Sequence, residues 1–105
     1  MASEGASPKQ ARKAAATRVS AYHEAQLAGL LERVREGFSR YDAGEIDAFE
    51  LDDLIHHYKR AARELWKLCA VSGSRVETVA RTLEYWSAED EQPDWWDAGA
   101  PRRRR

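Results

Sequence analysis

A single Gly-centred turn between two long amphipathic segments constrains this chain more than any other feature. Gly44 follows the first segment, and Gly is favoured just past a helix end because it adopts the left-handed conformation without steric cost. Asp47 is a candidate N-cap for the second segment, and Glu50 completes a capping box. A second capping box, Ser74 with Glu77, predicts the start of a third helix. The sequence therefore predicts an antiparallel helical hairpin followed by a further helix.

Apolar residues recur at helical spacing in all three segments, and in the first the alternating steps of four and three are typical of a coiled coil. The first seam contains Leu27, Leu31, Val34, Phe38 and Tyr41, with Leu30 widening it. The second contains Leu51, Leu54, Ile55, Tyr58, Ala61, Ala62, Leu65, Leu68 and Cys69, and the third contains Val76, Val79, Ala80, Leu83 and Trp86. We therefore predict an all-α fold, a long antiparallel helical hairpin plus a short third helix, with disordered termini. The expected helices cover 11–42, 47–71 and 74–88.

The chain is expected to contain one helical domain, residues 11–88, between two tails. Residues 1–10 are small and polar, which predicts a disordered N-terminal tail. Residues 89–105 combine acids, prolines, Trp and Arg, which predicts a flexible tail. Residues 11–20 lack large apolar side chains, so we expect this first part of the helix to fray or to project from the body.

Two neighbouring Trp residues, Trp95 and Trp96, lie in the acidic C-terminal tail. They either pack back onto the hairpin or dock on another protein, since buried Trp side chains anchor interfaces. Pro93 and five nearby acidic residues oppose stable packing within the chain. We therefore favour a docking element for a protein partner.

Positive charges gather at both ends of the chain, although its net charge is only −1. Lys9, Arg12, Lys13 and Arg18 lie near the start, and residues 102–105 are consecutive arginines. Basic ends bind nucleic-acid phosphates without sequence preference. Weak, non-specific nucleic-acid binding through the basic tails is therefore one alternative function.

The location of the protein is predicted from its cysteine content and its hydropathy. The single Cys69 lies in an apolar helical seam, so we expect a buried thiol in a reducing compartment. No apolar run approaches the roughly 20 residues that span a bilayer. The N-terminus lacks the apolar stretch of a secretory signal. We expect a cytoplasmic protein that does not associate with membranes.

The turn also resembles the second half of an EF-hand calcium loop. If Gly44 took the loop's central position, Tyr41 and Ala43 would stand where calcium requires oxygen ligands. The capping box explains the same acidic residues, so we do not assign a calcium site.

Asp53 and His56 form the other group of ligand-type side chains. A carboxylate and an imidazole at this spacing, with Glu32 and Glu36 on the facing helix, match half of the di-iron pattern of ferritin-like bundles. A metal-binding bundle assembled by dimerisation is therefore a second alternative. However, the apolar stripe of the second helix leaves His56 beside the core or exposed, so we assign no metal or cofactor ligand.

No motif of nucleophilic catalysis or phosphate binding occurs in the chain, so we expect no enzyme activity and assign no catalytic residue. The hairpin followed by Tyr85-x-x-x-Glu89 resembles the small helical-hairpin substrates of type VII secretion. The turn of that family carries Trp-x-Gly, whereas the equivalent turn here, residues 41–44, has no Trp. We therefore assign no family.

The apolar stripes of both long helices are wider than a two-helix seam requires. A chain of 105 residues in this arrangement rarely covers such stripes alone. We therefore expect a homo-oligomer, built by helix–helix packing. The sequence predicts a small non-enzymatic interaction protein that self-associates and has a second contact through Trp95 and Trp96.

Overall fold

The structure, a computed structural model, describes residues 7–101. Within that range the chain is all-α and contains four helices, α1 (Pro8–Asp42), α2 (Ala48–Cys69), α3 (Arg75–Glu89) and α4 (Trp95–Ala98). The predicted fold class is confirmed, and the three longer helices lie within a few residues of their predicted bounds. The predictions for residues 1–6 and for the terminal arginines, residues 102–105, lie outside the described residues.

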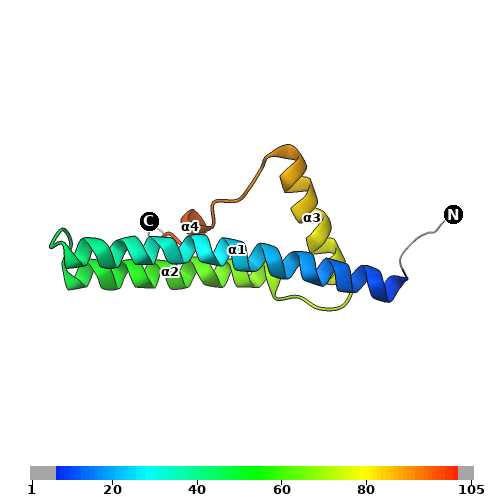
Figure 1. The fold of residues 1–105 in the computed structure, drawn as a ribbon, viewed down its shortest axis with the longest axis horizontal. Helices are drawn as coiled ribbons and strands as arrows, with labels where there is room; N and C mark the ends of the chain where they lie inside the picture. The colour runs from blue at the N-terminus through cyan, green and yellow to red at the C-terminus, as the bar shows by residue number, and fades with distance from the viewer. Residues whose placement is uncertain (1–6, 102–105) are drawn as a thin grey trace, which may run out of the picture.

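The longest helix, α1, is the element against which both α2 and α3 pack (Figure 1). Its C-terminal part lies alongside α2 and forms the hairpin, while α3 crosses its N-terminal part. After α3 the chain turns back, and α4 lies beside the middle of the hairpin. The arrangement is elongated, with extents of 63 × 34 × 25 Å.

The hairpin turn has the predicted geometry. Gly44 adopts a left-handed conformation with φ of 77°. The Asp47 side chain accepts a hydrogen bond from the Glu50 amide at 2.8 Å, and the Glu50 carboxylate accepts one from the Asp47 amide at 2.9 Å. The capping box therefore uses the acids that resemble a calcium loop.

Two other helix starts differ from the prediction. α1 begins at Pro8 rather than at residue 11, because Ser7 caps it and Gln10 completes a capping box. Pro suits the first helical position, where its missing N–H is not needed. At the start of α3, Ser74 is helical in conformation and makes no side-chain cap, so the predicted second capping box is absent.

The face of α1 that meets α2 is rotated from the predicted seam. Leu30, which widens the predicted apolar stripe of α1, is buried in the same cluster as Leu65 of α2. However, Leu31 and Phe38, expected at the centre of the seam, are 46% and 47% exposed, and Tyr41 is exposed as well. The predicted seam of α2 is confirmed at its buried positions, Leu51, Ala61, Leu65 and Cys69.

A small residue, Gly37, explains this rotation. It is buried, and a Cβ built on it would lie 3.0 Å from Cδ1 of Leu54 and 3.3 Å from Cδ1 of Leu51. The missing side chain lets α2 approach α1 on this flank. Gly29 of the same helix, by contrast, has nothing within 4 Å of a Cβ built on it.

The N-terminal part of α1 does not project from the body, contrary to expectation. Ala15 and Val19 are buried in one cluster with Val76, Val79 and Leu83 of α3. Small side chains on α1 let the crossing helix approach closely, so the lack of large apolar residues does not prevent packing. The predicted apolar face of α3 is confirmed.

Candidate functional site

The C-terminal segment, residues 91–101, packs against the hairpin, and Tyr22 of α1 is its first contact. The Trp95 indole N–H donates a hydrogen bond to the Tyr22 hydroxyl at 2.8 Å, and that hydroxyl lies 3.4 Å from Oε1 of Gln92. The Tyr22 ring also lies 6.3 Å from the Trp86 ring of α3, measured between centroids. Tyr22 therefore joins α1, α3 and the C-terminal segment.

The second contact is Trp96, which lies over α2. Its indole stacks on the His57 ring at 3.8 Å between centroids and 12° between planes, and its carbonyl oxygen lies 2.7 Å from Nε2 of His57. The Arg33 guanidinium of α1 lies 5.0 Å from the same indole, within cation–π range. Trp96 is thus held between a basic and an aromatic side chain.

The third contact is Gly99. Nε of Arg60 donates a hydrogen bond to the Gly99 carbonyl at 2.8 Å. A Cβ built on Gly99 would lie 2.6 Å from Cα of Ala61, which is fully buried. The segment therefore touches the backbone of α2, and only Gly fits. We call Tyr22, Arg33, His57, Arg60 and Ala61 the docking surface.

The structure differs here from the expectation of a flexible tail, and it agrees with the alternative in which the Trp pair packs back onto the hairpin. Trp95 and Trp96 are half-buried and pack against the core cluster. Asp94, one of the acids thought to oppose packing, caps α4 by accepting a hydrogen bond from the Asp97 amide at 3.0 Å.

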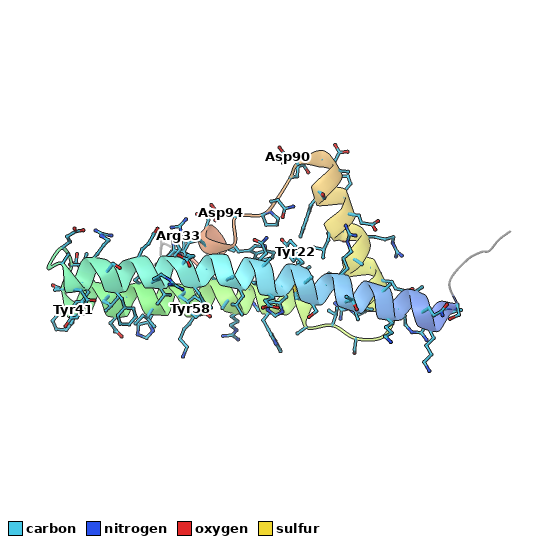
Figure 2. The ribbon with its side chains drawn as sticks, in the orientation of Figure 1. Tyr22, Arg33, Tyr41, Tyr58, Asp90 and Asp94 are labelled. Atoms are coloured by element: carbon cyan, nitrogen blue, oxygen red, sulfur yellow. The ribbon has the colours of Figure 1, made fainter. Side chains whose placement is uncertain are left out.

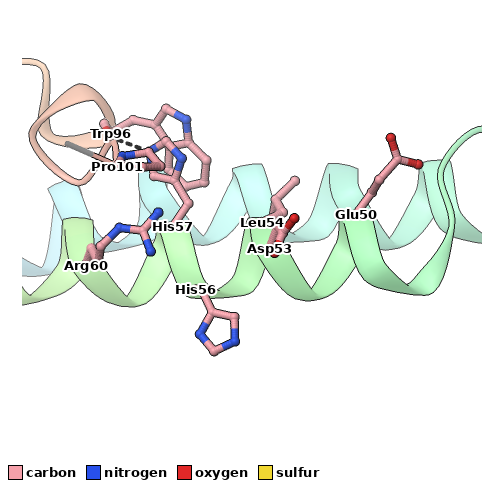
Figure 3. A pocket seen from close by; sticks show the side chains of 8 residues that line it. All are labelled: Glu50, Asp53, Leu54, His56, His57, Arg60, Trp96 and Pro101. Atoms are coloured by element: carbon pink, nitrogen blue, oxygen red, sulfur yellow. Dashed lines mark hydrogen bonds between the residues drawn. The ribbon is translucent and has the colours of Figure 1, made fainter. Parts of the chain in front are cut away.

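A groove continues from the docked segment along α2 toward the hairpin turn (Figure 3). Its volume is about 740 Å³, and Trp96 and Pro101 form one end. Glu50 and Asp53 line the other end, and Leu54 lies between. The groove is open to solvent and combines acidic, aromatic and basic side chains.

The opposite flank of the hairpin carries a second notable feature, an uncovered apolar face. In Figure 2, Tyr41 and Tyr58 lie on the side of the hairpin away from α4, whereas Tyr22 and Arg33 lie on the α4 side. Helical spacing places further partly exposed residues beside these two tyrosines. We call this set the open face: Leu31, Val34, Phe38 and Tyr41 of α1 with Ile55, Tyr58, Ala62 and Trp66 of α2.

The ligand-type side chains singled out in the sequence are not brought together. His56 is one of the residues that line the groove (Figure 3), and its Nε2 lies 3.3 Å from the Asp52 carboxylate, with both side chains exposed. Asp53 faces the groove, and Glu32 pairs with Arg35 of its own helix at 3.3 Å. Across residues 7–101, no three His, Cys, Asp or Glu side chains are grouped so that they could hold a metal ion.

The single thiol and one phenol are shielded by the fold. Burial raises the pKa of Cys69, which disfavours its reactive thiolate. Burial also raises the pKa of Tyr22, although the hydrogen bond from Trp95 opposes that shift. Both groups therefore remain protonated at neutral pH.

The basic residues near the N-terminus lie on exposed positions of α1. Lys9, Arg12 and Lys13 point outward on its first turns, and Arg18 lies 3.8 Å from the Glu84 carboxylate of α3. One of the four basic side chains is therefore partly neutralised within the molecule.

Comparison of the chain with protein-family models, curated proteins and solved structures gives no match. Tyr85 and Glu89, which carried the resemblance to type VII secretion substrates, both lie within α3. In the part of the chain that the structure describes, none of the helices combines the length and apolarity needed to cross a bilayer.

Proposed function

We propose that this chain is a small, non-enzymatic helical interaction protein that self-associates through the open face. The observation that supports this proposal is the exposure of large apolar side chains on one side of the hairpin. Leu31 and Phe38 are almost half exposed, and Trp66 is 59% exposed. Helical spacing places Leu31 and Phe38 on the same side of α1 as Tyr41, and Trp66 on the same side of α2 as Tyr58.

The open face would form the apolar centre of an interface, which as a whole covers about 800 Å² of each partner. Residues 55–66 of α2 extend about 16 Å at 1.5 Å per residue, and two adjacent helices are about 20 Å wide, which gives roughly 300 Å². Apolar patches of this size on monomers are often functional. Two hairpins that pack by these faces form a four-helix arrangement, the usual way of covering such stripes.

Sedimentation or light scattering at micromolar concentration tests this proposal. We expect a dimer or larger assembly of the 12.0 kDa chain. Phe38→Asp should give a folded monomer, because an unpaired carboxylate would be buried in the interface. Phe49→Asp is the matched control, since Phe49 is 82% exposed and lies outside the open face.

Two outcomes would refute the proposal. One is a wild-type monomer throughout the micromolar range. The other is an assembly that survives Phe38→Asp, or that Phe49→Asp disrupts equally. Circular dichroism of each variant separates dissociation from unfolding.

A further inference from the structure

The C-terminal segment contacts the hairpin in the way that a short peptide contacts a receptor. Its anchors are two aromatic side chains, Trp95 and Trp96, and one backbone contact at Gly99. Each anchor meets a different residue of the docking surface, and two of the three polar contacts involve main-chain carbonyls of the segment. Such contacts specify a sequence of aromatic residues followed by Gly.

The segment has little structure of its own. α4 is one turn of four residues, none of them fully buried. The chain leaves α3 at Asp90, a non-Gly residue in a left-handed conformation with φ of 55°, and residues 91–94 form no helix. The docked conformation is therefore imposed mainly by the docking surface.

We propose that the docking surface is a peptide-binding site that each chain fills with its own C-terminal segment, and that a second copy's segment can replace it. The occupant in exchange is identical, so the same contacts form between chains as within one. This inference deepens the proposed self-association by naming a second contact between copies. The exchange of segments rests on the proposed self-association only because two copies of the chain must come into contact.

In the intact chain, the chain's own C-terminal segment competes with a segment from a second copy. A tethered segment has an effective concentration of roughly millimolar at its own site. A peptide added from outside must displace it, so the apparent affinity of the peptide is its intrinsic affinity multiplied by the fraction of chains whose site is free. Exchange becomes measurable when the chain's own segment cannot dock.

Gly99→Val provides that condition in the full-length chain. The Val side chain would collide with the Ala61 backbone, so the substitution blocks docking. Because Gly99 has an ordinary negative φ, the substitution adds no backbone strain. The probe is a labelled synthetic peptide of residues 91–101, followed by fluorescence anisotropy. We expect the Gly99→Val chain to bind it at least about tenfold more tightly than the wild type does.

Matched variants identify the site. Ala98→Val alters the neighbouring exposed residue and should behave as the wild type. His57→Ala with Arg60→Ala, made in the Gly99→Val chain, should abolish peptide binding, and so should Trp96→Ala in the peptide. His57 and Arg60 are not fully buried, so these substitutions leave the hairpin core intact.

The inference is overturned if the Gly99→Val chain does not bind the peptide, or if the wild type binds it equally well. Peptide binding that persists in the His57→Ala and Arg60→Ala chain would also overturn it. Repeating the titration in a Phe38→Asp background separates the two proposals. Loss of assembly there with peptide binding retained would leave this inference standing independently of the open face.

Discussion

The two glycines within α1 offer a test of how closely the hairpin helices pack. Gly inside a helix costs roughly 0.5–1 kcal/mol relative to Ala. Gly29 has nothing within 4 Å of its would-be Cβ, so Gly29→Ala should gain this full amount. For a chain of about 100 residues that corresponds to a rise in melting temperature of roughly 2–5 °C.

Gly37→Ala should gain the same free energy from helix propensity, but its added methyl group would contact Leu54. Its methyl group would lie 3.0 and 3.2 Å from the two Cδ atoms of Leu54, closer than the roughly 3.5–4.0 Å of a favourable carbon–carbon contact. Overpacking of this kind typically costs about 1–3 kcal/mol. We therefore expect Gly37→Ala to be less stable than the wild type by about 0–2.5 kcal/mol.

Urea unfolding followed by circular dichroism, at one protein concentration, measures both variants. The reasoning is refuted if Gly37→Ala stabilises the protein as much as Gly29→Ala does, because α2 would then not approach α1 at this point. A destabilising Gly29→Ala would show that Gly29 meets another helix in the assembled protein.

Other predictions concern the turn, the exposed histidine and the phenol. Gly44→Val should destabilise the hairpin by roughly 1–2 kcal/mol in urea unfolding, because φ is 77° there, and Asp47→Ala should cost about 1 kcal/mol as a lost cap. Added calcium should leave both results unchanged. His56→Ala should be nearly silent in thermal unfolding, and elemental analysis should find no stoichiometric metal; about one metal per chain or dimer, lost in that variant, would contradict this. Burial raises the pKa of Tyr22 above its ordinary value of 10.0. The neutral phenol therefore contributes to the free energy of unfolding, and this contribution is complete at pH values below 10. That part of the stability should be lost as pH rises above 10, and Tyr22→Phe should reduce the alkaline loss in a pH series of unfolding curves. Trp95→Phe removes the hydrogen bond to Tyr22, so it should lower the stability by about 1 kcal/mol.

The features that could be predicted from the sequence are those set by neighbouring residues. Gly44, Asp47 and Glu50 act within one turn, so their geometry follows from local rules. The face of α1 could not be predicted in the same way, since it depends on Gly37 meeting Leu54 of another helix. A 3.6-residue period locates an apolar stripe but not which flank of it is covered.

The packing of the C-terminal segment was still harder to predict, because its contacts join residues that are far apart in the sequence. His57 and Trp96 are 39 residues apart in the sequence, and Tyr22 and Trp95 are 73 apart. Composition predicted a flexible tail because acids and prolines dominate it. A signal did exist: Gly99 shortly after two Trp residues, with a small residue, Ala61, on the apolar stripe of α2.

Because α1 packs on α2 along one part and on α3 along another, its amides should fall into two groups in hydrogen exchange. One half of this helix packs on α2, the other half packs on α3, and α2 and α3 barely meet each other. Amide protection in native-state exchange follows cooperative units rather than helices. The amides of α1 before Tyr22 should therefore exchange at the rate of α3, and those after it at the rate of α2. A single continuous helix would thus belong to two units that open separately, with Tyr22 at their boundary.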